Sequence, residues 1–261
     1  MEVLMKRSNV YIHNVTPEQQ KILCWLALFT ILTKKHMQKL LRHKDHKWVS
    51  VCISRLQADG YVKEVPFTFG RTKIFALSTK GMLLVKRINT TDTQHKQIAK
   101  NISFAQIDRF LCIADVYVQL NENSKDTLSF IAKANLSRES KIITPDAYLT
   151  YTESTRIKTY FLELDRETQS MNPMEKKLER YSQYFYSKQW KRITPDHFPA
   201  VCIICFTQER KRNLMNLAED LFNTSHFAPI VFKFTTLDEI NNGTQKDICL
   251  VPFEKKLYPI L

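Results

Sequence analysis

The chain has 261 residues, of which 44% are hydrophobic and 25% charged, a composition typical of a soluble globular protein with one large domain or two ordinary ones. Only four glycines occur, and no two lie close enough to form the backbone cradle of a P-loop or a dinucleotide-binding turn, which makes nucleotide-dependent motors and Rossmann oxidoreductases poor candidates. The formal net charge of +13 is unevenly spread, because residues 1–100 carry 18 Lys and Arg against 6 Asp and Glu. Such a basic segment attracts polyanions, of which nucleic acid is the commonest soluble example.

An anionic membrane surface is the rival partner for the basic segment. The chain shows no lipidation signal, no apolar run long enough to span a bilayer and no secretory signal, so we expect a cytoplasmic protein that does not bind membranes. The six cysteines lie mostly inside apolar runs and are predicted to be core residues. Cys202 and Cys205 form a lone CxxC without further ligands at metal spacing, so no zinc or redox site is expected there.

The basic segment begins with three predicted helices. The first spans Thr16 to Leu32, with Thr16 as N-cap, Pro17 at the first helical position and Gln19 closing a capping box. Apolar residues then recur at helical spacing and form one buried stripe. A second helix over residues 33–43 and a third over residues 45–58 follow the same periodicity.

Two β-rich runs, residues 61–69 and 72–78, follow the third helix and are joined through Gly70 and Arg71. Residues 14–88 thereby resemble a winged helix-turn-helix DNA-binding domain, in which the third helix enters the major groove and the wing lies along the backbone. The resemblance implies a set of base-contacting side chains, Lys47, Ser50, Ser54 and Arg55, and a set of phosphate-binding side chains, Lys34, Lys35, Lys39, Arg71 and Lys73. The alternative is a winged helix that contacts proteins and carries ordinary solvated charges.

The second half of the chain is predicted to be a mixed α/β domain. Residues 1–90 form the expected winged-helix domain, residues 91–102 a polar linker and residues 103–261 the second domain, which makes the fold class α+β. Its periodicity predicts helices near residues 104–120, 173–190 and 208–223 and strands near residues 127–133, 147–151, 158–164, 200–206 and 229–234. These elements would form a mixed sheet covered by helices.

Three carboxylates in this domain are candidates for chemistry. Glu163 and Asp165 lie two residues apart on a predicted strand, so their side chains leave the same face. With Asp146 at the start of a neighbouring strand, the three acids would converge and suit Mg²⁺ or Mn²⁺. We therefore predict Asp146, Glu163 and Asp165 as metal ligands and catalytic residues. A turn and a solvated strand edge are the structural alternatives for these motifs.

The order of these motifs resembles that of the PD-(D/E)xK nuclease superfamily. More narrowly, ITPDAYLTY, YFLELDRETQS and EKKLERYSQYF resemble the second half of the replication-relaxation family of plasmids and integrative elements, in which a winged helix precedes such a domain. The resemblance implies that Thr168 joins the three acids in the acidic motif and that Lys177 and Tyr181 form the KxxxY motif. The nuclease pattern places a lysine two residues after the strand acid, where this chain has Asp165, so Lys177 would have to replace it from the helix.

Two functions stay open at this point. The first is a DNA-binding protein of a mobile genetic element, acting in replication, mobilisation or transcriptional control, with double-stranded DNA as its ligand and a homodimer or other mobile-element proteins as further partners. The second is a Mg²⁺- or Mn²⁺-dependent DNA endonuclease that the winged helix targets. A rolling-circle relaxase is not supported, because no HxH metal motif occurs in the sequence.

Overall fold

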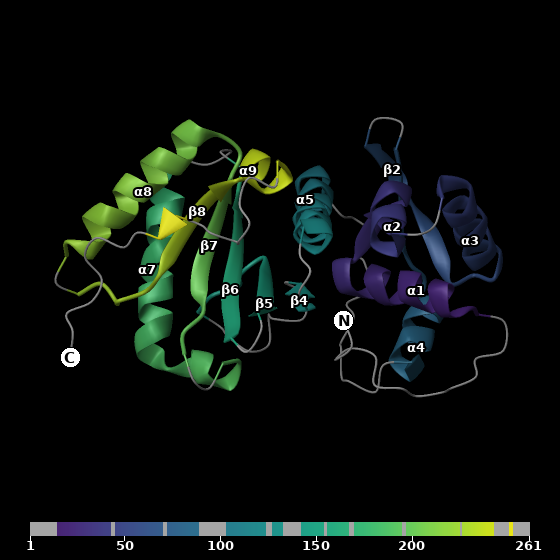
Figure 1. The fold of residues 1–261 in the computed structure, drawn as a ribbon, viewed down its shortest axis with the longest axis horizontal. Helices are drawn as coiled ribbons and strands as arrows, with labels where there is room; N and C mark the ends of the chain where they lie inside the picture. Colours follow the sequence, from purple (N-terminus) through teal and green to yellow (C-terminus); the bar gives the residue numbers. More distant parts are fainter. Residues whose placement is uncertain are drawn as a thin grey trace. The chain divides into compact units, whose positions relative to one another are not determined.

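The protein folds into two compact units, Met1–Glu122 and Asn123–Leu261, which are described separately (Figure 1). The computed structural model describes residues 15–42, 45–69, 72–88, 103–123, 127–132, 142–153, 156–166, 170–194, 197–224, 226–242 and 251–252. None of the helices in these ranges is long and apolar enough to cross a membrane.

The first unit contains five helices within its described residues and a three-stranded antiparallel sheet of order β1-β3-β2. Its elements are α1 (Pro17–Phe29), β1 (Ile31–Thr33), α2 (Lys34–Leu41), α3 (His46–Ala58), β2 (Val62–Phe69), β3 (Thr72–Leu77), α4 (Thr79–Ile88) and α5 (Phe104–Asn123). The predicted helices and the β2–β3 hairpin of a winged helix are therefore confirmed, and so is the capping box between Thr16 and Gln19.

The first helix ends earlier than the sequence predicts. It stops at Phe29, because Thr30 takes a positive φ of 72°, and the next three residues form β1. Ile31 pairs with Ala76 and Thr33 with Ile74, so β1 adds a third strand to the hairpin. Ile31 and Leu32 are both apolar and buried, so they fit a last helical turn as well as a short strand. Only their pairing with β3 shows that they belong to a strand.

The long helix α5 packs with the first unit. Its Ile107 and Leu111 belong to the same buried cluster as Ile31 of β1 and Ile74 of β3. The sequence predicts this helix at the start of a second domain of residues 103–261, behind a linker of residues 91–102. The chain divides into its two compact units at residue 122, and α5 lies in the first of them except for its last residue. An apolar stripe shows that a helix is buried without showing which core covers it.

The second unit is built on a six-stranded mixed sheet of order β4-β5-β6-β7-β8-β9. Its elements are β4 (Thr127–Ala132), β5 (Ala147–Glu153), β6 (Arg156–Asp165), α7 (Met171–Ser187), η2 (Gln189–Arg192), β7 (Ala200–Cys205), α8 (Gln208–Phe222), β8 (Phe232–Thr236), α9 (Leu237–Asn241) and β9 (Val251–Pro252). The expected α+β class and mixed sheet are confirmed, whereas η2, α9 and β9 carry no clear signal in the sequence.

The central strands β6, β7 and β8 run parallel, and the flanking pairs are antiparallel. In the register, Phe161 pairs with Val201 and Glu163 with Ile203, so these four side chains leave the same face of the sheet. Phe161, Val201 and Ile203 share one hydrophobic core with residues of α7 and α8, which cover that face. Glu163 therefore projects into a helix-covered layer.

Candidate functional site

The outward face of α3 carries the base-contacting residues that the sequence predicts. Asp45 caps this helix by accepting a hydrogen bond from the Trp48 N–H, at 2.6 Å from Oδ1. The apolar side chains Val49, Cys52, Ile53 and Leu56 are buried on the inner face. The opposite face bears Lys47, Ser54 and Arg55, which are exposed, while Ser50 is half-buried at its margin. The helix is thus held by its apolar face and presents donors outward.

The predicted phosphate-binding residues have different local partners. Lys35 is exposed, and Lys34 Nζ donates to Ser50 Oγ at 3.3 Å and lies 6.0 Å from the centre of the Phe75 ring. Lys39 Nζ lies 3.1 Å from Glu122 Oε2 of α5, and Lys73 Nζ lies 3.0 Å from Glu64 Oε2 on the hairpin. Arg71 lies outside the described residues. Ion pairs this exposed contribute under about 1 kcal/mol each, so both lysines can exchange their partner for a phosphate.

Sequence reasoning missed one residue on this face. Val51 is 46% exposed and follows Lys47 by one helical turn, among the predicted base-contacting side chains. A helical projection of α3 would have found it, because it is apolar at a position where the periodicity demands a polar residue.

In the second unit, Glu163 is the centre of a buried polar cluster. The side chain projects from β6 beneath α7, where Lys177 Nζ lies 2.6 Å from its Oε2 and the Tyr181 hydroxyl donates to its Oε1 at 2.7 Å. Glu163 and Tyr181 are each 1% exposed. Lys177 and Tyr181 are one helical turn apart, so a KxxxY spacing places both donors over the same acid.

The other two predicted acids flank Glu163 and have their own partners. Asp146, which immediately precedes β5, accepts a hydrogen bond from the Leu164 N–H at 2.9 Å from Oδ2, and its own N–H donates to Leu162 O. Asp165 Oδ2 lies 2.6 Å from Arg210 Nε of α8, and both side chains are almost fully buried. The acids therefore lie near one another, as the sequence predicts, but α7 and α8 bring a cation to two of them. Thr168 lies outside the described residues.

Burial has the largest effect on the pKa values of Glu163 and Tyr181. It raises the pKa of Glu163, the nearby Lys177 ammonium opposes that rise, and the carboxylate of Asp146 adds to it. The pKa of Tyr181 is raised well above its ordinary value, first by burial and then by the negative charge of Glu163. The tyrosine therefore stays a neutral hydroxyl that donates to the carboxylate at ordinary pH.

The residues as arranged do not fit a divalent cation. Both oxygens of Glu163 bind protein donors, Asp165 is paired with Arg210, and the described residues contain no group of three His, Cys, Asp or Glu side chains arranged to hold a metal ion. Lys177 and Arg210 supply the positive charge that Mg²⁺ or Mn²⁺ would bring. The two ion pairs link β6 to α7 and α8, and removing one partner would leave an uncompensated buried charge.

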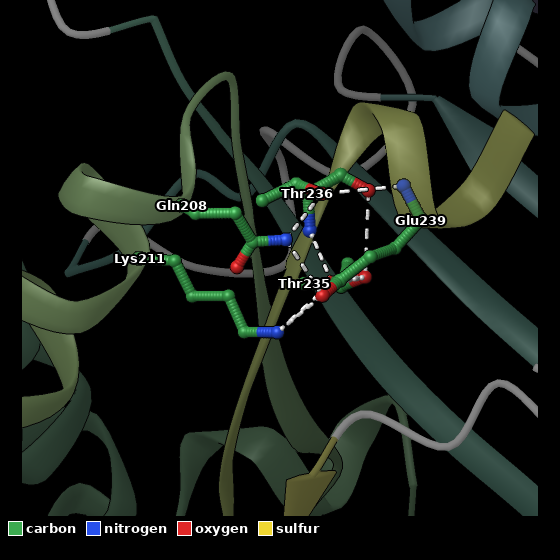
Figure 2. A network of polar contacts seen from close by, with 5 residues as sticks. All are labelled: Gln208, Lys211, Thr235, Thr236 and Glu239. Carbon is green, nitrogen blue, oxygen red and sulfur yellow. Dashed lines mark hydrogen bonds and ion pairs between the residues drawn. The ribbon is translucent and has the colours of Figure 1, made fainter.

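A second polar network, which the sequence did not indicate, lies at the carboxyl end of β8 (Figure 2). Lys211 of α8 is nearly buried, and its Nζ donates to both oxygens of Glu239 in α9, at 2.8 and 2.9 Å. Gln208 Nε2, Thr235 Oγ1 and the Thr236 N–H donate to the same carboxylate. Burial raises the pKa of Glu239, but the hydrogen bonds from Lys211, Gln208 and the two threonines outweigh it and lower that pKa to about 2.

Comparison with solved structures finds distant likenesses. The E. coli MarR protein in complex with operator DNA is 22% identical over 36% of this chain and 69% of MarR, with a TM-score of 0.27. A mutant MepR from S. aureus is 21% identical over 42% of this chain and 81% of MepR, with a TM-score of 0.28. The restriction endonuclease FokI is 11% identical over 95% of this chain and 48% of FokI, with a TM-score of 0.36. No curated protein matches the sequence significantly.

The residues that match a known protein family extend over both units. The sequence profile named replication-relaxation matches residues 23–198, from α1 to the segment before β7, and so includes α3, Asp146, Glu163 and the Lys177–Tyr181 pair. The match spans more than half of the chain, and it agrees with the motifs identified in the sequence. The chain belongs to the replication-relaxation family.

Proposed function

We propose that the protein binds duplex DNA through its first unit, with α3 in the major groove and the β2–β3 hairpin along the backbone. The observation that carries the proposal is the division of α3 into a fully buried apolar face and an outward face with Lys47, Ser54 and Arg55. Side chains on the exposed face of a groove-inserted helix reach base edges. The charge supports this function, since residues 1–100 carry a net charge of +12.

Phosphate contacts would come from the residues around α3. Lys34, Lys35 and Lys39 belong to the preceding helix, and Arg71 and Lys73 to the hairpin segment. Each phosphate that a lysine or arginine neutralises releases counterions, so binding should weaken steeply as salt rises. Ser50 would be positioned for its base contact by the hydrogen bond from Lys34.

The family match supports a proposal for the biological role. We propose a DNA-binding protein of a plasmid or integrative element that acts in replication, mobilisation or transcriptional control, and whose second unit mediates assembly with a second copy or with other mobile-element proteins. Glu163 and Asp165 pair with Lys177 and Arg210, and Asp146 accepts a backbone hydrogen bond, which supports a structural role for these acids. The competing function is a Mg²⁺- or Mn²⁺-dependent endonuclease that uses these acids and Lys177.

A binding assay with the full chain tests the proposal. Duplexes of different sequence would be titrated at several salt concentrations, with the Lys47→Ala and Arg55→Ala variants beside the wild type. We expect steep salt dependence, and each variant should lose about 1–3 kcal/mol of discrimination between sequences. Exposed Lys176 on α7 gives the control variant Lys176→Ala, which should bind like the wild type. The proposed function would be excluded if the wild type and all three variants bound every duplex with equal affinity at every salt concentration.

A further inference from the structure

Val51 is the one large apolar side chain of α3 that is exposed. The apolar residues Val49, Cys52, Ile53 and Leu56 are at most 5% exposed, whereas Val51 is 46% exposed. Its side chain therefore contributes less to the core than these four do, and it leaves apolar surface open to a partner. An apolar group in that position gains free energy when a partner covers it.

The position of Val51 indicates which partner covers it. Lys47 lies one turn before it, Arg55 one turn after it, and Ser54 three residues after it, so all four share the outward face of α3. Lys47 lies nearest the middle of that face, Val51 and Ser54 flank it, and Arg55 and the half-buried Ser50 lie toward the two margins. An apolar group is thus surrounded by donors suited to base edges and phosphates.

We propose that Val51 contacts the C5-methyl group of a thymine and so selects thymine at one position of the bound sequence. The inference rests on the proposed binding of duplex DNA through α3 and adds a specificity-determining residue to it. Among the base edges in the major groove, the thymine methyl is the apolar group, and small aliphatic side chains recognise it by direct contact. Lys47, Ser54 and Arg55 hydrogen-bond to neighbouring base edges, while Val51 recognises the methyl group by an apolar contact that removes water from both surfaces.

The test uses the full chain and a duplex that it selects from a randomised library. Each thymine of that duplex is replaced in turn by uracil, which lacks only the C5-methyl group. We expect the wild type to lose about fourfold in affinity at one thymine, as for the loss of one buried methyl-sized contact. The Val51→Ala variant should bind the parent duplex more weakly and show no further loss on that replacement. Restoring the bulk with 5-bromouracil should restore wild-type affinity.

Leu83→Ala is the matched control. Leu83 is 55% exposed on α4 and also lies among basic residues, Lys80, Lys86 and Arg87, so it matches Val51 in exposure and surrounding charge. This variant should keep the wild-type response to uracil. The inference is overturned if no thymine position responds, if Val51→Ala keeps the discrimination, or if Val51→Ala changes only the oligomeric state. Failure to enrich any duplex would instead reject the proposed DNA binding.

Discussion

His36 of α2 and Asp115 of α5 are 79 residues apart in the sequence, and their side chains meet at 2.9 Å between Nε2 and Oδ1. The Thr33 N–H donates to His36 Nδ1 at 3.2 Å, so the neutral ring carries its proton on Nε2 and donates it to the carboxylate. The His36 N–H in turn donates to Thr33 Oγ1, which completes a capping box at the start of α2. One imidazole therefore caps one helix and ties it to another.

Replacing His36 should cost more than replacing Asp115. His36 is 4% exposed, and His36→Ala leaves the Thr33 N–H without its acceptor, so we expect unfolding free energy to fall by about 1–3 kcal/mol. The Asp115 side chain is 59% exposed, and Asp115→Asn keeps an oxygen acceptor, so its effect should stay under about 1 kcal/mol. Urea denaturation measures both. A larger loss in Asp115→Asn would assign the stability to the charge.

The Glu163–Lys177 pair should behave as a buried acid with a partly exposed cation. Lys177→Met leaves the buried carboxylate of Glu163 without this cation, although the Tyr181 hydroxyl still donates to it, and we expect a loss of about 1.5–3 kcal/mol in unfolding free energy. The double variant with Glu163→Gln should recover most of that loss, because no buried charge remains. A double-mutant cycle by chemical denaturation gives the coupling. Additive losses would show that the two side chains act independently.

Divalent cations should not stabilise the wild type. Lys177 and Arg210 already neutralise Glu163 and Asp165, so Mn²⁺ or Mg²⁺ at millimolar concentration should leave the melting temperature unchanged apart from ionic-strength effects. We also expect no cleavage of duplex or single-stranded DNA in either metal. The endonuclease hypothesis would be supported by a Mn²⁺-induced rise in melting temperature that Glu163→Gln abolishes, together with cleavage that the same variant loses.

Glu239 should make stability depend on pH in the acid range. The folded pKa of about 2 lies below the ordinary value of 4.5, so the stabilisation is fully present above pH 4.5 and is lost as pH falls toward 2. Glu239→Gln removes the partner of Lys211, so it should destabilise the second unit at neutral pH and flatten the pH profile between those two values. Thermal melts across pH 2–6 make the comparison. A wild-type profile retained in the variant would exclude Glu239 as the source.

Lys35 should contribute to DNA affinity without contributing to sequence preference. It is exposed on α2 beside α3, and a lysine that contacts phosphate strengthens binding to every duplex alike. We expect Lys35→Ala to weaken binding to all sequences by a similar factor and to lower the slope of log affinity against log salt by about one. Salt titrations of Lys35→Ala and Lys176→Ala measure this difference, and identical slopes would remove Lys35 from the interface.

Local signals in the sequence determined three helices and the hairpin of the first unit, but not the short strand β1. Thr16 and Gln19 define the start of α1, the buried positions of α3 recur at helical spacing, and the hairpin follows a glycine at positive φ, Gly60. Capping and periodicity act within a few residues, so they can be recognised without knowing the rest of the chain. Strand alternation likewise predicted that Glu163 and Asp165 leave the same face, and the family resemblance added Lys177 of the next helix.

Only the tertiary structure decided which groups meet across the chain. The apolar stripe of α5 fits either unit, and its contacts with Ile31 and Ile74 assign it to the first. Arg210 lies 45 residues from Asp165, and Lys211 lies 28 residues from Glu239, yet both pairs form because α8 and the carboxyl ends of the central strands come together. No local periodicity in the sequence indicates such a pairing. Partners of buried charges depend on how helices dock on the sheet, and docking is determined by the whole core.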